Sequence, residues 1–349
     1  MIKELKDIAW NISEEEYRAD PALSYSTLAR YEREGFSKVD QLFDKVESPS
    51  LLLGSIVDCI LTDGKEEFDK RFMVAEFPAI PDSIITVVKD AFRLYGTQYN
   101  SLYSIPDNYI VSIALTYNYQ PNWRPETRAK VIKEKGVEYY GLLYLSKDKT
   151  IVSNETYETA LKMIDALKTH VSISFYFKPD NPFDSNIKRY YQLKFKATLN
   201  EVDYRCMADL LIVNYKDKII YPIDLKTSYK HEYEFYKSFM DWRYDIQARL
   251  YWRIIRDNLD KDEYFKDFKL DDYRFVVVSR DLHPLIWIFR NTQSLDELRY
   301  GRLENITMRD PETIGQELNY ILAHNPVYPS GIKPEGDNDI VKWIEMTNY

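Results

Sequence analysis

Two short apolar runs separated by a polar turn give the clearest pattern in this chain. Residues 207–213 and 219–225 are almost wholly apolar, and the segment Asn214-Tyr-Lys-Asp-Lys218 lies between them. Apolar runs of this length bounded by turn residues are typical of buried strands. The pattern predicts a β-hairpin within two or three strands over 190–223. Further strands are predicted at 273–279 and 285–289.

Apolar positions with helical spacing predict helices at 24–33, 51–61, 155–168 and 239–256. Ser24 or Ser26 is the expected N-cap of the helix at 24–33. The segment 51–61 is apolar nearly all round, so we expect a buried helix there. Asp58 is an acid on this helix, one turn after Gly54. The segment 82–118 is rich in Tyr and Ile but has only weak periodicity.

Two charged residues interrupt the second apolar run. Asp224 and Lys226 lie in YPIDLKTS, and charges seldom occur in a buried strand unless they are paired or hold a metal. If Lys216 and Asp217 form the tip of a tight hairpin, Asp209 lies directly opposite Asp224. Opposite side chains have Cβ atoms about 4.5–5.5 Å apart. Lys226 shares the face of Asp224, because strand side chains alternate.

Two facing carboxylates repel each other, and a divalent cation between them removes the conflict. Oxygen ligands favour Mg²⁺ or Mn²⁺, and Lys226 beside the ion could act on an attacking water or on phosphate charge. Gln247 shares a helical stripe with Tyr244 and Tyr251, which suggests an amide directed into the same site. The alternative is a buried Asp–Lys ion pair with Asp209 capping a turn. The spacing leaves both interpretations open.

Composition narrows the class of protein. The chain has 349 residues, 45% hydrophobic and 30% charged, which is ordinary for a globular protein. Its two cysteines exclude a disulfide framework. No apolar run is long enough to span a bilayer, and residues 1–10 lack the pattern of a signal peptide. We therefore expect a cytoplasmic protein without a membrane partner.

The formal net charge of −9 argues against a general nucleic-acid coat protein. A local basic surface could still contact DNA. The run 121–135 contains Arg124, Arg128 and Lys130, which are candidates for such a surface. A solvated helix face is the alternative for this run.

Three motifs in order carry a family resemblance: Arg205-x-x-x-Asp209, then Asp224-Leu-Lys-Thr-Ser228, then Arg243-Tyr-x-x-Gln247. Together they resemble the core of the PD-(D/E)xK nucleases, and most closely the RecE-like branch that includes exonuclease VIII. The stretches ISEEEYRADPALSYSTL, LLLGSIVDCILTDGKEEFDKRFMV and GLLYLSKDKTIVSNETYETALKMIDALKTH resemble further elements of that branch. Residues 82–118 look like an insertion.

The resemblance implies an α/β (α+β) fold with a mixed central sheet flanked by helices. It implies a single nuclease domain over 1–349, with a catalytic core at 186–256. The implied activity is Mg²⁺- or Mn²⁺-dependent exonuclease digestion of linear double-stranded DNA, in recombination or repair by a phage or mobile element. The implied partners are a single-strand annealing recombinase and further copies of the chain in a ring.

The resemblance also assigns roles to residues. Asp209 and Asp224 would ligate the metal, and the Leu225 carbonyl would add a ligand. Lys226 would lie at the attacking water and Gln247 would support the site. The residues expected to contact DNA are Thr227, Ser228, Arg243 and Tyr244.

The chain departs from the family pattern at two positions. Asp58 stands where the family has a metal-binding histidine, and a carboxylate there could still ligate Mg²⁺ or Mn²⁺. Many relatives have a Glu on the strand before the core, whereas 190–192 contains no acid. Two alternatives therefore remain open: an endonuclease or nuclease subunit of a transposition or repair complex, and a catalytically silent DNA-binding protein with the same fold.

Overall fold

The chain divides into two compact units, Met1–Gly54 with Met163–Tyr349, and Ser55–Lys162. The computed structural model describes residues 3–44, 46, 48–147, 149–181, 183, 186–290 and 308–324. Two helices run through the boundaries between the units, α3 (Pro49–Thr62) and α8 (Asn154–Thr169). Each unit is described separately below.

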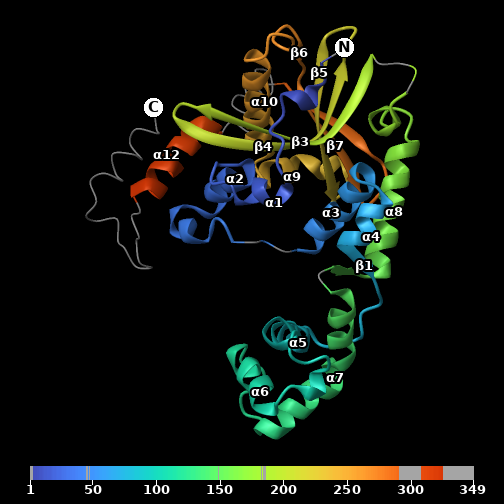
Figure 1. Ribbon diagram of the computed structural model, residues 1–349, viewed down its shortest axis with the longest axis vertical. Helices are drawn as coiled ribbons and strands as arrows, with labels where there is room; N and C mark the ends of the chain where they lie inside the picture. The colour runs from blue at the N-terminus through green and yellow to red at the C-terminus, as the bar shows by residue number, and fades with distance from the viewer. Residues whose placement is uncertain are drawn as a thin grey trace. The chain divides into compact units, whose positions relative to one another are not determined.

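A six-stranded mixed sheet forms the centre of the first unit (Figure 1). Its strand order is β3-β4-β5-β7-β8, and the short β6 (Lys269–Leu270) pairs with β5. The β3–β4, β4–β5 and β7–β8 pairs are antiparallel, whereas β5 pairs in parallel with β7 and β6. The strand bounds are β3 (Ile187–Leu199), β4 (Val202–Asn214), β5 (Ile219–Ser228), β7 (Tyr273–Ser279) and β8 (Leu285–Phe289).

The predicted hairpin is confirmed together with its register. The β4–β5 ladder runs from Asn214–Ile219 to Leu210–Ile223, which is the pairing expected when Lys216 and Asp217 form the tip. The turn is longer than the tight two-residue form and covers 215–218. Asn214 stabilises it, because its Oδ1 accepts a hydrogen bond of 3.0 Å from the backbone N–H of Asp217.

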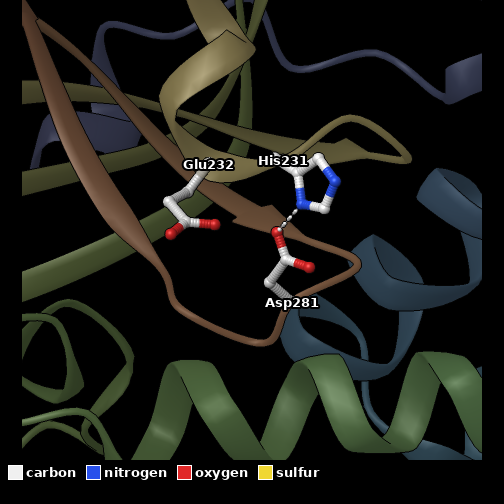
Figure 2. Close-up of side chains that lie close together, drawn as sticks. All are labelled: His231, Glu232 and Asp281. Atoms are coloured by element: carbon white, nitrogen blue, oxygen red, sulfur yellow. Dashed lines mark hydrogen bonds and ion pairs between the residues drawn. The ribbon is translucent and has the colours of Figure 1, made fainter.

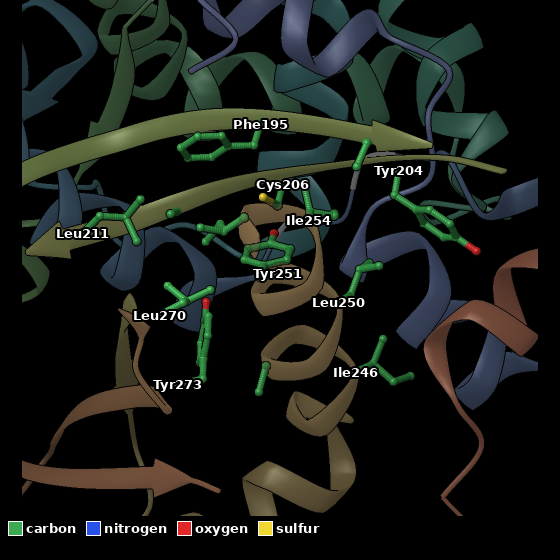
Figure 3. Packing of buried hydrophobic residues seen from close by; sticks show 14 of the residues in the cluster. Phe195, Tyr204, Cys206, Leu211, Ile246, Leu250, Tyr251, Ile254, Leu270 and Tyr273 are labelled. Atoms are coloured by element: carbon green, nitrogen blue, oxygen red, sulfur yellow. The ribbon is translucent and has the colours of Figure 1, made fainter. Parts of the chain in front are cut away.

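Helices cover this sheet, as predicted. The long helix α10 packs against β3, β4 and β7, and α2 and α12 pack against α10. Figure 3 shows apolar side chains of β3 and β4, including Phe195 and Cys206, facing Leu250 and Ile254 of α10. Burial of this layer drives the packing. The helices of this unit are α1 (Glu14–Ala19), α2 (Tyr25–Glu34), α9 (Phe235–Asp241), α10 (Tyr244–Asp260) and α12 (Pro311–His324). Four 3₁₀ turns accompany them: η1 (Leu5–Asp7), η2 (Phe36–Gln41), η4 (Ser174–Phe177) and η5 (Glu232–Glu234).

Three helix predictions need refinement. The single helix expected at 239–256 is broken into α9 and α10, because Arg243 takes a left-handed backbone with φ +53° at the N-cap of α10. Ser24 is the N-cap residue of α2, but its hydroxyl bonds to those of Ser26 and Thr27 and does not cap the helix. On α3, Leu51 is 52% exposed, so this helix is not buried all round.

The second unit contains a helical cluster and a two-stranded parallel sheet of β1 (Phe72–Val74) and β2 (Thr150–Val152). Its core gathers Ile84, Val88, Ile132 and Tyr140, among others. The segment 82–118, whose weak periodicity predicted no element, forms two helices and a 3₁₀ turn between them. The remaining elements are α4 (Lys65–Arg71), α5 (Asp82–Tyr95), η3 (Leu102–Ser104), α6 (Asp107–Thr116) and α7 (Pro125–Ser146). Among the helices that the structure describes, none is both long and apolar enough to cross a membrane.

Candidate functional site

Asp224 and Lys226 form a buried ion pair on one face of β5. Asp224 is 1% exposed, and the Nζ atom of Lys226 lies 2.7 Å from its Oδ2 atom. The alternation of β5 puts both side chains on the same face, as predicted. Burial alone would lower the pKa of Lys226, but the neighbouring Asp224 carboxylate raises it above its usual value. Lys226 is therefore a cation held in place by its carboxylate neighbour.

Asp209 lies where β4 and β5 separate. The last paired residues are Leu210 and Ile223, and beyond them β5 continues to pair only with β7. Asp209 takes the place of the missing strand partner, because its Oδ2 accepts a hydrogen bond of 2.9 Å from the backbone N–H of Leu225. In a strand, the N–H and C=O of one residue point to the same side. The Leu225 carbonyl therefore also faces the opening between the two strands.

Gln192 faces Asp209 from the neighbouring strand. The β3–β4 ladder pairs Tyr191 with Leu210 and Leu193 with Ala208, so Gln192 and Asp209 lie across from each other between these two pairs. Gln192 has a left-handed backbone with φ +52°, which is rare for a strand residue that is not glycine. The backbone of β3 is therefore distorted directly across from Asp209. A glutamine gives no sequence signal of this conformation, and the sequence did not identify Gln192 as a site residue.

The side chains of β4 that join the main core cluster change from even to odd positions around Asp209. On β4 the core side chains before it are at even positions, such as Cys206 and Ala208, and after it at odd positions, Leu211 and Val213. A regular strand keeps one phase throughout. The sequence did not indicate this change, because Leu210 to Val213 are all apolar and hide the phase.

Gln247 on α10 reaches the site from the helix layer. Its Nε2 donates a hydrogen bond of 2.5 Å to Oδ1 of Asp224, as the predicted stripe suggested. Its Oε1 is buried and has no hydrogen-bond partner. A buried polar atom without a partner costs about 1–3 kcal/mol. This orientation of the amide therefore leaves one acceptor available within the site.

An aromatic group supports Lys226. The Nζ atom lies 4.6 Å from the ring centroid of Tyr244, within the range of a cation–π contact. The Tyr244 ring stacks on Phe235 and Phe275. Tyr244 is thus a half-buried support for the lysine, and its predicted contact with DNA stays a prediction.

Arg243 belongs to an ionic cluster at the start of α10. Its Nε donates to Oδ1 of Asp245 at 2.9 Å, and its Nη1 donates to Oε2 of Glu32 at 2.6 Å. Asp245 is fully buried and also pairs with Arg249. Arg309 joins the cluster through Glu32, on α2. This cluster fastens α10 to α2, and the predicted DNA contact of Arg243 stays a prediction.

The remaining predicted residues on β5 adjoin this site. Thr227 lies on the face opposite to Lys226, and a Cβ atom added to Gly54 would lie 3.3 Å from its Oγ1. Gly54 therefore allows the start of α3 to lie against β5. Ser228 accepts a hydrogen bond of 3.1 Å from the backbone N–H of Lys230. Contacts of Thr227 and Ser228 with DNA stay predictions.

Four predicted residues lie in the second unit. Asp58, on α3, is half-buried, and its role as a metal ligand stays a prediction. Arg124, the N-cap residue of α7, and Lys130, on α7, are exposed. Arg128 is 2% exposed, and its guanidinium donates to the carbonyl oxygens of Gln120, Pro121 and Trp123. This burial does not fit the predicted DNA contact of Arg128, and we assign it the structural role of holding the loop before α7.

The donor atoms at the end of the β4–β5 ladder fit a hard divalent cation. Asp209 contacts the backbone of Leu225 there, and Asp224 is the neighbour of Leu225 in β5. The two carboxylates and the Leu225 carbonyl are all oxygen ligands. Each carboxylate has more lone pairs than the hydrogen bonds described above use. Mg²⁺ and Mn²⁺ are the ions that such a set selects. Asp209, Asp224 and Leu225 would hold the ion.

The chain has few matches among known proteins. No family model and no curated protein matches it. Among solved structures it is similar to a crystal structure of a candidate exonuclease from Eubacterium rectale. The identity is 14% and the TM-score 0.42, over 94% of this chain and 100% of the other. So distant a likeness decides nothing about function, which has to be argued from the site.

Proposed function

We propose that this chain is a metal-dependent nuclease. Its active site for phosphodiester hydrolysis would be formed by Asp209, Asp224, Lys226 and Gln247. The observation that carries the proposal is the position of the Asp224–Lys226 pair. It lies beside the point where β4 leaves β5, with a second carboxylate, Asp209, at that point. A purely structural ion pair does not require an opened ladder beside it.

The residues of the site have separable roles. Asp209, Asp224 and the Leu225 carbonyl would hold Mg²⁺ or Mn²⁺, which when bound lowers the pKa of water and neutralises phosphate charge. Lys226 would orient the attacking water or stabilise the charge on the phosphate. Gln247 would hold the Asp224 carboxylate in a fixed orientation through its hydrogen bond.

The finer assignment rests on the motif resemblance. An exonuclease of the RecE-like branch would act on linear double-stranded DNA in phage or mobile-element recombination. The order of the elements supports this, because β4, β5 and α10 present the three motifs side by side. Arg124 and Lys130 would contribute the basic surface for DNA. A homo-oligomeric ring and a recombinase partner belong to the same proposal.

A catalytically silent DNA-binding protein is the second candidate. The observation that favours it is the pairing of Asp224, whose two oxygens face Gln247 and Lys226. In that case Asp224 would stabilise the fold without a metal ion. An endonuclease would use the same residues on a different DNA substrate.

The test compares end-labelled linear duplex DNA with covalently closed circular DNA, in Mg²⁺, in Mn²⁺ and in EDTA. We expect cleavage of linear DNA only, with no cleavage in EDTA or by Asp224→Asn. Asp217→Asn, at the hairpin tip, is the matched control and should cleave normally. Cleavage of circles would indicate an endonuclease, and binding without cleavage in every condition would establish the silent protein.

A further inference from the structure

A second group of possible metal ligands lies beyond the ends of the two parallel strands β5 and β7. His231 and Glu232 follow β5, and Asp281 follows β7 (Figure 2). One ligand atom from each residue can be chosen so that all three lie within 4.8 Å of one another. The Nδ1 atom of His231 lies 2.6 Å from Oδ2 of Asp281. Within the described residues, no other group of three such ligands is found.

The backbone fixes the positions of these three residues. The β5–β7 ladder ends at Ser228–Ser279, and the N–H of Arg280 then donates to the carbonyl of Ser228 at 3.0 Å. The N–H of Asp281 bonds to Oγ of Ser279. The ring of His231 stacks on that of Tyr233, with an interplanar angle of 3°. His231 and Asp281 therefore lie just beyond the ends of two paired strands, and stacking on Tyr233 orients the His231 ring.

The electrostatics of the group favour a cation. Glu232 and Asp281 bring two carboxylates together, and like charges at this distance repel. His231 is the only ring nitrogen donor among the three. Either a proton shared between His231 and Asp281 or a bound cation can relieve the repulsion. A metal ion would neutralise the carboxylates of Glu232 and Asp281 together, whereas the shared proton links His231 to Asp281 alone.

We infer that His231, Glu232 and Asp281 bind a divalent transition-metal ion, separate from the oxygen-ligand site on β4 and β5. One imidazole and two carboxylates favour Zn²⁺ or Mn²⁺ over Mg²⁺, because imidazole suits borderline ions. Ligand atoms about 2.1 Å from one ion lie about 3.0–3.5 Å from each other in octahedral or tetrahedral geometry. The His231–Asp281 contact would open slightly on binding and the carboxylates would close in. Both movements are within the reach of side-chain rotation.

The site would connect two loops that are far apart in the sequence. His231 and Asp281 are separated by 50 positions, and each begins the loop that follows a central strand. A bound ion would therefore hold these loops together directly after the strand that carries Lys226. Its effect should appear in stability, because a ligand that binds only the folded state raises the melting temperature.

The test is calorimetric titration of the full chain with ZnCl₂ and with MgCl₂. We use the Asp209→Asn, Asp224→Asn double variant to remove the oxygen-ligand site, and the unsubstituted chain as a second background in case the double variant does not fold. We expect Zn²⁺ binding that 1 mM MgCl₂ does not displace. His231→Ala and Asp281→Asn should each weaken it at least tenfold. His283→Ala removes an exposed histidine two positions after Asp281 and should leave the affinity unchanged.

A thermal melt provides the second measurement. Zn²⁺ should raise the melting temperature of the unsubstituted chain and of His283→Ala, but not that of His231→Ala. Equal Zn²⁺ affinity in His231→Ala and His283→Ala would overturn the inference. So would the absence of Zn²⁺ binding in a folded chain, which would leave the hydrogen bond between His231 and Asp281 as the whole function of the group.

Discussion

Gln192 and Asp209 face each other across β3 and β4, between the pairs Tyr191–Leu210 and Leu193–Ala208. Gln192 takes a left-handed backbone there, and Asp209 turns its carboxylate toward β5. A left-handed conformation costs a residue other than glycine about 1–2 kcal/mol. The surrounding ladder therefore holds a strained residue beside the proposed metal ligand.

The strain gives the first prediction. Gln192→Gly should leave the free energy of unfolding unchanged or raise it by up to about 1 kcal/mol, because glycine adopts positive φ without steric cost. The matched control is Lys194→Gly on the same strand, which lacks the positive φ and should lose about 0.5–1 kcal/mol. Urea denaturation measures both. Equal losses in the two variants would show that Gln192 is not strained.

Lys226→Ala should abolish cleavage of linear DNA, because the ammonium that orients the attacking water or stabilises phosphate charge would be lost. It should also cost about 3–5 kcal/mol in EDTA, since Asp224 would lose its partner while buried. Mg²⁺ should restore part of this loss, because an ion on Asp224 replaces the missing ammonium. The measurements are nuclease assays and thermal melts with and without Mg²⁺.

The control for this variant is Lys237→Ala, which removes a lysine from a half-exposed pair with Glu234 and should change stability by less than about 1 kcal/mol. If Mg²⁺ stabilises Lys226→Ala no more than the unsubstituted chain, Asp224 is a structural partner and the metal role is wrong.

Gln247→Ala should lower the free energy of unfolding by about 1.5–3 kcal/mol, the range for a hydrogen bond to a charged group. Cleavage should fall in parallel, because the Asp224 carboxylate would lose its orientation. Gln316→Ala, at an exposed position of α12, is the control and should be neutral. A Gln247→Ala variant with normal stability and normal turnover would refute the role of this amide.

Substitution of the basic residues at α7 should distinguish those that contact DNA from the one that stabilises the fold. Arg124→Gln and Lys130→Gln together should flatten the salt dependence of DNA affinity by about one unit of log–log slope for each lost phosphate contact. Arg128→Gln should instead destabilise the protein, because three carbonyls lose their buried donor. Filter binding at several salt concentrations and urea denaturation distinguish the two effects. An unchanged slope in the double variant would remove α7 from the DNA surface.

The two cysteines should be unreactive in the native protein. Cys59 and Cys206 are both fully buried, and burial raises the pKa of each thiol. A raised pKa leaves less of the nucleophilic thiolate at neutral and mildly alkaline pH. A thiol reagent at pH 8 should modify neither cysteine in the native chain, and both in guanidinium chloride. Rapid modification of Cys206 without denaturant would contradict its place beneath α10.

The sequence predicted the parts of the site that depend on local periodicity. Alternation on β5 put Asp224 and Lys226 on one face, and the turn position gave the register that brings Asp209 to this end of the hairpin. The ladder stops at Leu210–Ile223, one pair before the expected Asp209–Asp224 pair. The helical stripe on α10 indicated Gln247. Each of these relationships involves residues that are close in the chain or related by one hairpin, so period and turn position are sufficient to derive them.

Other parts could not be derived because they depend on tertiary contacts. The basic composition of 121–135 does not reveal that Arg128 is buried while Arg124 is exposed. The approach of His231 to Asp281 requires the parallel register of β5 and β7, which no local pattern specifies. The break between α9 and α10 depends on Arg243, whose left-handed backbone is accompanied by contacts with Asp245 and with Glu32 of α2.

The crossover from β5 through α10 to β7 has a consequence for the order of folding. The β3–β4–β5 meander is joined by short turns, whereas β5 can pair with β7 only after the intervening helices have formed or collapsed. Asp209, Asp224 and Lys226 would thus be brought together early, before Gln247 and β7 enclose them. Pulse-labelled hydrogen exchange should detect early protection in the meander and later protection in β7. During synthesis on the ribosome, Asp209 and Asp224 would therefore be in place while the proposed metal site was still exposed to water and lacked Gln247.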